Sequence, residues 1–411
     1  MLTFDQKLDN LASIALRVGV NLQHDARLLL IGPIEATELM RRITAQAYDL
    51  GASYVHVQYV DDHVGLIRAQ HARRETLGRV PQEYVDMIQT MAARGDAYLR
   101  IDGGDPDLMS AADPERVATM VRAGRQAMRP VSDLVQRAFM PWTIVPYAVP
   151  AWASKVFPDL AADEAQERLW DAVFAATRAD LDDPVGAWHA HIERLGAIAH
   201  RLSWCAFEGL HLRGPGTDLR IGLAEGHVWE SGGRESAVNG LRSVHNVPTE
   251  EVFTAPHARR GDGTVRASKP LSYQGQLIEE FSLTFEEGRV VDATAGRGGR
   301  VLQGLLDTDE GSRRLGEVAL VPHSSPISQS GLLFYDTLFD ENAASHVALG
   351  RAYETTMRDG VTRPLEALQR DGFNQSLAHV DFLIGSADLD VDGLAAGGVA
   401  TPVMRAGEWV L

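Results

Sequence analysis

Hydrophobic and polar positions follow two different periods in the N-terminal half of the chain. An apolar run at residues 27–32 and a β-branched, aromatic run at residues 54–60 predict two strands. Between them, apolar residues recur at helical spacing over residues 35–50, and Gly51 follows as a C-cap. A strand, a helix and a second strand in this order form a βαβ unit, and residues 97–101 predict a further strand. The pattern therefore predicts an α/β N-terminal domain with a mainly parallel sheet.

The pattern changes near residue 205. Two long helices are predicted before it, over residues 161–174 and 185–204, whereas short strand-like runs linked by Gly and Asp turns dominate after it. A chain of 411 residues is too long for one ordinary core, so two domains are expected. We predict an α/β domain at residues 1–205 and an α+β, metal-binding C-terminal domain at residues 206–411.

Net charge, apolar runs and cysteine content indicate which partners and which cellular compartment to expect. The formal charge is −17, with 56 Asp and Glu against 39 Lys and Arg, and an acidic surface repels nucleic acid. The sequence has no apolar run long enough to span a membrane and no secretory signal at its start, so no membrane partner is expected. A single cysteine, Cys205, excludes an internal disulfide and a thiolate metal cage. We expect a cytoplasmic protein.

The segment at residues 377–385 is the most informative of the C-terminal half. Its alternation predicts a strand, and side chains two positions apart on a strand point to the same face. His379 and Asp381 would therefore share one face, with apolar residues on the other. An imidazole and a carboxylate placed together can bind a metal ion, although a surface strand with two polar residues explains the same pattern.

Two adjacent glutamates, Glu250 and Glu251, precede another apolar strand. Adjacent residues of a strand face opposite ways, so the two carboxylates are expected to have different roles. If Glu251 faces a metal ion, Glu250 faces elsewhere unless the backbone bends there. The alternative is a solvated pair of glutamates at the start of a strand.

A further candidate, Glu317, stands near the start of a strand whose other residues are all apolar. Burial of an ionised carboxylate without a partner is costly, so Glu317 needs a cation nearby. That cation could be a metal ion, or the guanidinium group of Arg313 or Arg314.

Residues 340–353 carry the last two candidates. Asp340 is a suitable N-cap, and the alanines that follow it favour a helix. His346 and Tyr353 are seven positions apart, about two turns, and would share one face of this helix. A histidine on a helix is more often an ordinary core residue than a ligand, and a tyrosine more often only packs.

Together these candidates supply three carboxylates and two imidazoles. They are Glu251, Glu317, His346, His379 and Asp381. The set suits two divalent cations about 3.5–4 Å apart that share a carboxylate and a water molecule. Oxygen and nitrogen ligands without sulfur fit zinc, cobalt or manganese. Whether the five residues meet at one point does not follow from their spacing.

The segments that hold these residues closely resemble the thermophilic aminopeptidase family, the aminopeptidase T and aminopeptidase S metallopeptidases. The resemblance rests on residues 248–254, 315–321, 340–346 and 379–381. It extends to residues 142–146, 214–219 and 391–393, and so covers essentially the whole chain.

The resemblance implies a two-metal centre held by the five candidate ligands, with Tyr353 beside it. The family's spacing to the next glutamate favours Glu251 over Glu250 as the ligand. We expect Glu250 to act as the general base and Tyr353 to donate a hydrogen bond to the oxyanion. The family also implies a homodimer whose N-terminal domains help to enclose the site, and peptide substrates with apolar N-terminal residues.

Two other functions fit part of the pattern. Two-metal centres also hydrolyse phosphate esters, but the sequence has no strongly basic phosphate-binding motif. A non-catalytic α/β protein with a structural cation is the second alternative. We expect a metal-dependent aminopeptidase that releases the N-terminal residue of peptides with a free N-terminus.

Overall fold

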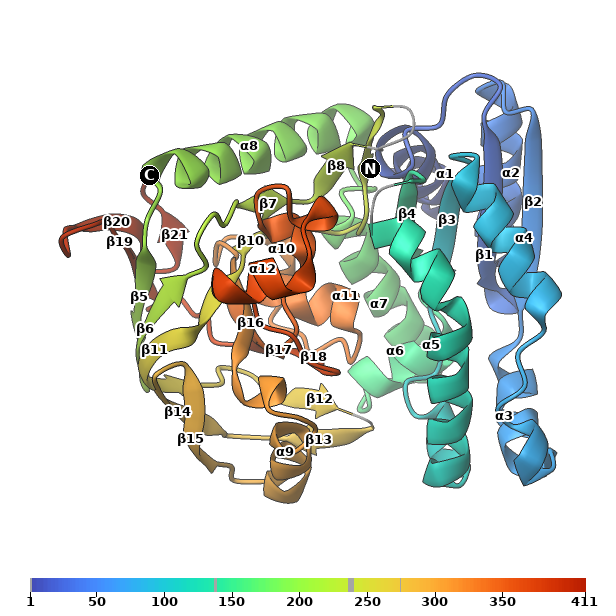
Figure 1. Cartoon of the computed structure of the whole chain (residues 1–411). Coiled ribbons are helices and arrows are strands. Elements are labelled where there is room, and N and C mark those ends of the chain that lie inside the picture. Colours follow the sequence, from blue (N-terminus) through green and yellow to red (C-terminus); the bar gives the residue numbers. More distant parts are fainter. Residues whose placement is uncertain (1, 137–138, 236–239, 274) are drawn as a thin grey trace. The chain divides into compact units, whose positions relative to one another are not determined.

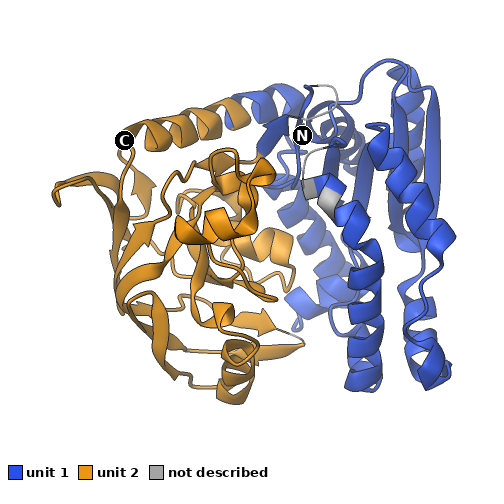
Figure 2. Cartoon of the chain, viewed as in Figure 1, with its two compact units in different colours: residues 1–191, 233–248 blue, residues 192–232, 249–411 orange. Residues whose placement is uncertain are grey.

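The computed structural model describes residues 2–136, 139–235, 240–273 and 275–411, which form two compact units (Figure 2). Unit 1 contains residues 1–191 and 233–248, and unit 2 contains residues 192–232 and 249–411. The chain first passes between the units within helix α8 (Pro184–Cys205). The domain boundary predicted at residue 205 coincides with the end of this helix and stays a prediction.

Unit 1 is built on a four-stranded parallel sheet with the strand order β2-β1-β3-β4 (Figure 1). Its strands are β1 (Arg27–Pro33), β2 (Tyr54–Val60), β3 (Ala97–Asp102) and β4 (Trp142–Pro146). All residues of β1 except the first are buried, as expected for a parallel strand that is covered on both faces. The predicted α/β architecture with a parallel sheet is confirmed.

Helices connect and cover these strands. They are α1 (Phe4–Ile14), α2 (Thr37–Asp49), α3 (Asp62–His71), α4 (Gln82–Ala93), α5 (Pro114–Gln136), α6 (Pro150–Val156), α7 (Ala162–Ala176) and the first part of α8. Helix α2 forms the predicted βαβ connection, and α4 and α5 pack on the sheet through one apolar cluster. The buried members of that cluster are Leu29, Ile31, Val85, Ile88, Met91 and Val131. Among the described residues, no helix is long and apolar enough to cross a membrane.

Unit 2 contains a large antiparallel sheet of eight strands, in the order β15-β14-β11-β6-β5-β19-β20-β21. These strands are β5 (Gly209–Gly214), β6 (Thr217–Leu223), β11 (Pro256–Arg266), β14 (Ser282–Glu286), β15 (Arg289–Thr294), β19 (Asp390–Leu394), β20 (Ala400–Arg405) and β21 (Glu408–Trp409). Short β-hairpins add β8 (Gly233–Glu235) and β9 (Arg242–Val244) to unit 1, and β12 (Leu271–Tyr273) and β13 (Gln276–Ile278) to unit 2.

A second antiparallel sheet of unit 2 has five strands in the order β18-β17-β16-β10-β7. They are β7 (Glu230–Ser231), β10 (Val252–Thr254), β16 (Leu315–Leu320), β17 (His346–Gly350) and β18 (His379–Leu383). The helices of this unit, besides the end of α8, are short: α9 (Gly299–Leu306), α10 (Pro326–Ser330), α11 (Thr337–Asp340) and α12 (Leu365–Arg370). Antiparallel sheets combined with short helices make unit 2 an α+β structure, as predicted.

The helix predicted from Asp340 through Tyr353 is wrong. Helix α11 ends at Asp340, a 3-10 turn follows at Glu341–Ala343, and His346 then opens the buried strand β17. The alanines favour a helix locally, but pairing with strands on both sides outweighs that preference.

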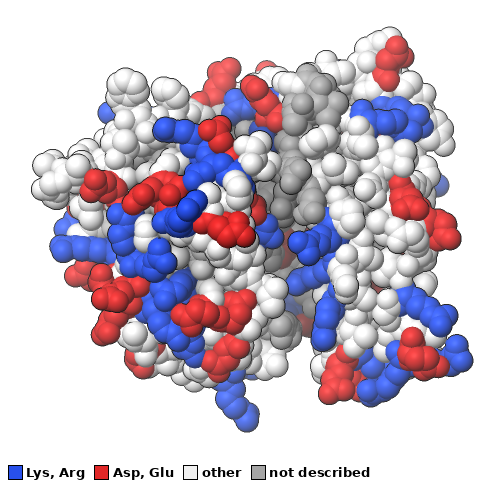
Figure 3. All heavy atoms as spheres, in the orientation of Figure 1, with Lys and Arg blue, Asp and Glu red and all other residues white. Residues whose placement is uncertain are grey.

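On the face of unit 2 drawn in Figure 3, the acidic side chains do not gather in one patch. Figure 3 shows Lys and Arg side chains interspersed with Asp and Glu over the face of unit 2 that is drawn. Opposite charges at short range largely cancel at a distance, so this face has no extended region of one sign.

Candidate metal centre

Neighbouring strands of the five-stranded sheet carry four of the five predicted ligands. Glu317 lies on β16, His346 on β17, and His379 and Asp381 on β18. Ala348 of β17 pairs with Glu317 on one side and with Asp381 on the other. Paired residues of an antiparallel sheet point to the same face, and so do residues two apart on one strand. The register therefore brings all four side chains to one face of the sheet.

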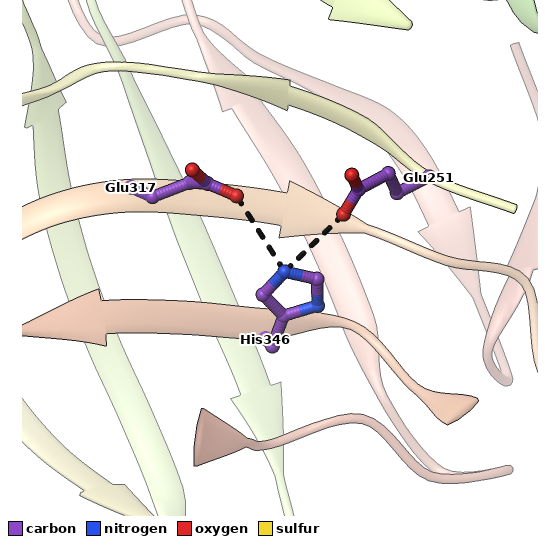
Figure 4. Close-up of side chains that lie close together, drawn as sticks. All are labelled: Glu251, Glu317 and His346. Carbon is purple, nitrogen blue, oxygen red and sulfur yellow. Dashed lines mark ion pairs between the residues drawn. The ribbon is translucent and has the colours of Figure 1, made fainter. Parts of the chain in front are cut away.

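The fifth predicted ligand, Glu251, directly precedes β10, which pairs with β16. Figure 4 shows Glu251 and Glu317 pointing at the ring of His346. The Nε2 atom of His346 lies 3.3 Å from Oε2 of Glu251 and 3.5 Å from Oε1 of Glu317. These three side chains offer donor atoms within 4.8 Å of one another.

A second group of three uses the other oxygen of Glu317. The Nε2 atom of His379 lies 3.8 Å from Oε2 of Glu317 and 3.5 Å from Oδ1 of Asp381. These donor atoms also lie within 4.8 Å of one another. Glu317 thus belongs to both groups, with Oε1 directed to one histidine and Oε2 to the other.

Backbone carbonyl groups orient both imidazole rings. The Nδ1 atom of His379 lies 2.7 Å from the carbonyl oxygen of Arg351, and Nδ1 of His346 lies 3.2 Å from that of Ala344. A proton on Nδ1 can be donated to such a carbonyl, which leaves Nε2 directed at the carboxylates. This arrangement is typical of histidines that bind metal ions.

The arginine partners considered for Glu317 do not bind it. Arg313 forms its ion pair with Asp307, and Arg314 forms its ion pair with Glu310. Glu317 is only 5% exposed. Its charge is therefore buried beside histidines and other carboxylates instead of a guanidinium group.

The donor atoms of this cluster fit divalent cations. Buried oxygens of Glu317 (Oε2) and Asp381 (Oδ1) receive no hydrogen bond from any residue that the structure describes. Buried polar atoms are normally satisfied, and a cation would satisfy these. Carboxylate oxygens with imidazole nitrogens, and no sulfur, suit zinc, cobalt or manganese.

Mutual attraction shifts the pKa values within the cluster. Burial lowers the pKa of His379, but the charges of Asp381 and Glu317 outweigh it and raise that pKa to about 10. Burial likewise opposes the shift in Asp381, whose pKa falls to about 2 because His379 lies beside it. Burial raises the pKa of Glu317, and the hydrogen-bonding ring of His346 opposes the rise. The negative charge of the cluster is therefore strong enough to hold protons on imidazoles, and a divalent cation would compete for the same sites.

Tyr353 lies beside this cluster, although not through the helix that was predicted. It follows β17 and precedes a 3-10 turn at Glu354–Thr356. Its ring centroid is 4.6 Å from that of His379 and 6.4 Å from that of Phe253. Burial of the phenol and the charge of Glu317 raise the pKa of Tyr353 well above its ordinary value, even though 37% of the residue is exposed. The hydroxyl group therefore stays protonated and can act as a donor.

Glu250 faces a different environment from Glu251. It is 2% exposed, and its backbone N–H donates a 2.7 Å hydrogen bond to the side-chain oxygen of Asn342. Among the described residues, the groups of three that could hold a metal ion include Glu251 and leave out Glu250. The two glutamates therefore have different environments, and the roles expected for them stay a prediction.

Glu341 is an acidic residue near the cluster that is not among the predicted ligands. It stands in the turn before β17, where burial and the charges of Glu251 and Asp381 raise its pKa well above its ordinary value. In a helix, Glu341 and His346 would point in different directions. The only sequence signal for Glu341 is its position five residues before His346. That position indicates a site residue only if the stretch between them is a turn and not a helix.

Comparison with known proteins agrees with this geometry. The sequence model described as thermophilic metalloprotease (M29) matches residues 4–409. The chain is 46% identical over 409 residues to aminopeptidase T of Thermus thermophilus, and the match covers 99% of each chain. It is 44% identical over 406 residues to aminopeptidase 2 of Geobacillus stearothermophilus, which covers 99% of this chain and 98% of that one.

Solved structures give the same result. The structure of wild-type AmpT from Thermus thermophilus matches with a TM-score of 0.94 and 44% identity, and the match covers 100% of both chains. Similarity of this extent applies to both units and includes the sheet that holds the cluster. The chain therefore belongs to the thermophilic metalloprotease (M29) family and is a metal-dependent aminopeptidase.

Proposed function

We propose that this aminopeptidase works with two divalent cations, held by Glu251, Glu317 and His346 on one side and by Glu317, His379 and Asp381 on the other. The observation that carries the proposal is the position of Glu317, whose two carboxylate oxygens face two different histidines. A carboxylate shared in this way is the usual bridge of a two-metal hydrolase. Glu341, with its charge close to the cluster, is a candidate for a further ligand.

Bound cations at this position would make a water molecule more acidic and would polarise the carbonyl group of the first peptide bond. The rest of the reaction falls to the side chains. Glu250, which is buried and adjacent in sequence to a ligand, accepts the proton of the attacking water and delivers it to the leaving amine. Tyr353 donates a hydrogen bond to the oxyanion.

Aromatic side chains support a preference for apolar N-terminal residues. Phe253 of strand β10 pairs with Ala319 of β16, which shares a face with Glu317, and the ring of Phe253 approaches that of Tyr353. An apolar side chain placed between these rings and the cluster would lose contact with water, which stabilises the complex. The family resemblance further supports a homodimer whose N-terminal domains help to enclose the site. The ligand chemistry supports zinc, cobalt or manganese as the metal, and the single cysteine fits the cytoplasm.

Metal analysis together with activity tests the proposal. Purified protein should contain two divalent ions per chain, and EDTA should abolish hydrolysis of leucyl-p-nitroanilide, which added zinc, cobalt or manganese restores. A panel of aminoacyl anilides should give higher kcat/KM for apolar than for charged residues, and p-nitrophenyl phosphate should not be hydrolysed. A fully active protein with one ion per chain would overturn the two-metal centre and leave the aminopeptidase activity intact.

A further inference from the structure

An open cavity of about 750 Å³ lies in unit 2, outside the metal cluster. The cavity lies where the two antiparallel sheets of this unit are joined by backbone hydrogen bonds. Beyond β11, the backbone N–H of Ala267 donates to the carbonyl of Phe281, and that of Ser268 donates to the carbonyl of Leu383 at the end of β18. None of the five candidate ligands lines the cavity. Its volume is in the range of pockets that bind drug-sized molecules and exceeds what a single amino acid fills.

The turn between β5 and β6 positions one cation of this cavity. Gly216 has a positive φ of +75°, and a Cβ atom on it would lie 2.8 Å from Cδ of Arg266. The backbone N–H of Arg266 also donates a 3.1 Å hydrogen bond to the hydroxyl group of Thr217. Glycine at position 216 therefore leaves room for the stem of Arg266. This is a structural role for the segment at residues 214–219 that the metal chemistry does not use.

Two cations of the lining have no carboxylate partner. Arg266 and Lys269 form no ion pair with any residue that the structure describes. The ammonium group of Lys269 lies 3.3 Å from the carbonyl oxygen of Leu332, and burial lowers its pKa although Asp340 attracts it from beyond ion-pair distance. An anion in the cavity would stabilise both the partly buried ammonium group and the guanidinium group of its lining.

The opposite charge in the cavity is held in a strained conformation. Glu280 has a φ of +51°, which is unusual for any residue other than glycine. Its carboxylate forms no ion pair within the described part of the chain, whereas that of Glu279 pairs with Arg297. Strained backbone that persists at a cavity often serves to present a side chain to a ligand.

We propose that this cavity binds a short peptide in its zwitterionic form, with the α-carboxylate at Arg266 and Lys269 and the α-ammonium group at Glu280. Apolar lining residues, Pro215, Pro270 and Ile384, would accommodate its side chains. Charges of both signs are needed for such a ligand, and the volume favours two or three residues over one. The proposal does not depend on the number of metal ions or on the roles given to Glu250 and Tyr353.

Isothermal titration calorimetry tests the proposal on the full-length holoenzyme. A hydroxamate inhibitor first occupies the metal centre, and the absence of hydrolysis shows that it is blocked. Leucyl-leucine should then bind at one site per chain. Binding should weaken at least about tenfold for N-acetyl-leucyl-leucine, which lacks the ammonium group, and for leucyl-leucinamide, which lacks the carboxylate, because each loses a charge-assisted contact. Free leucine, titrated in parallel, distinguishes a peptide site from an amino-acid site.

Variants assign the site to this cavity. Arg266→Met and Glu280→Gln should each weaken leucyl-leucine binding at least about tenfold, whereas Arg300→Met, an exposed charge outside the lining, should not. Metal content and melting temperature show whether each variant is folded, and Glu280→Gln keeps the shape of the side chain if Arg266→Met proves unstable.

No binding to the blocked holoenzyme, or equal binding by Arg266→Met, Glu280→Gln and the parent, would overturn the proposal. Tighter binding of free leucine than of the peptide would also overturn it.

Discussion

Central strands of the two units are buried to the same degree but carry different chemistry. In unit 1, every residue of β1 after Arg27 is buried, and all of these are apolar or glycine. In unit 2, all six residues of β16 are buried, and one of them is Glu317. A carboxylate in such a position is costly unless it has partners, and here histidines from the next two strands of the sheet provide them. Burial alone therefore does not distinguish a structural strand from one that carries a site, whereas a buried charged side chain does.

The pKa values of two histidines, one in each unit, differ in the same way. In unit 2, carboxylates raise the pKa of His379 to about 10 although burial opposes the shift. In unit 1, His245 stacks on Trp142 with ring centroids 4.3 Å apart, and burial together with the charge of Arg234 lowers its pKa to about 3. Similar side chains thus favour opposite charge states because their neighbours differ. Only the first environment suits a cation.

Replacement of Glu317 by glutamine should remove the buried negative charge that distinguishes β16 from β1. The amide has the same shape but cannot serve as an anionic bridge, so both metal positions lose a ligand. We expect metal content to fall and kcat/KM to drop by more than about a hundredfold, beyond the 10–100-fold typical of residues that only support ligands. Metal analysis and leucyl-p-nitroanilide hydrolysis measure the two effects. Unchanged metal content in Glu317→Gln would contradict the bridging role.

Glu250→Gln separates catalysis from metal binding. If Glu250 is the general base, kcat should fall about 10²–10⁴-fold while metal content stays normal. The same metal analysis and a steady-state kinetic series check this. Loss of metal in this variant would show that Glu250 and Glu251 have been assigned the wrong way round.

Leu29→Ala tests whether the central strand of unit 1 contributes to stability and not to the metal centre. Leu29 is fully buried on β1, in the cluster that joins the sheet to α4 and α5. The cavity left by the substitution should lower the free energy of unfolding by about 2–5 kcal/mol. Metal content and kcat of the protein that remains folded should not change. Urea denaturation and metal analysis test the two statements, and loss of metal from the folded variant would contradict the second.

Local patterns predicted the parallel sheet because β1, α2 and β2 each follow one clear period. They also identified each candidate ligand, since a histidine or a carboxylate in an apolar run is conspicuous. Their meeting at one face depends on register, including an irregularity between Leu315 and Glu317 in the pairing of β16 with β17. No short segment encodes such long-range pairing. The alanines around His346 predict a helix where the structure has a turn and a strand, and Glu341 gains its place near the cluster from that turn.

The smallest expected effect concerns the titration of His245. Its pKa in the folded protein, about 3, lies below the usual value near 6.5, so folding favours the neutral ring. The stability from this group is complete above about pH 6.5 and is lost as the pH falls toward 3, by at most about 1.4 kcal/mol per unit and less where solvent reaches the ring. His245→Phe keeps an aromatic ring on Trp142 and removes the titration, so urea denaturation between pH 7 and 4 should show a weaker loss of stability than in the parent. His24→Phe, at a side chain that is 83% exposed, is the matched control and should follow the parent. An equal loss of stability in His245→Phe and the parent would mean that other groups determine the acid sensitivity of unit 1.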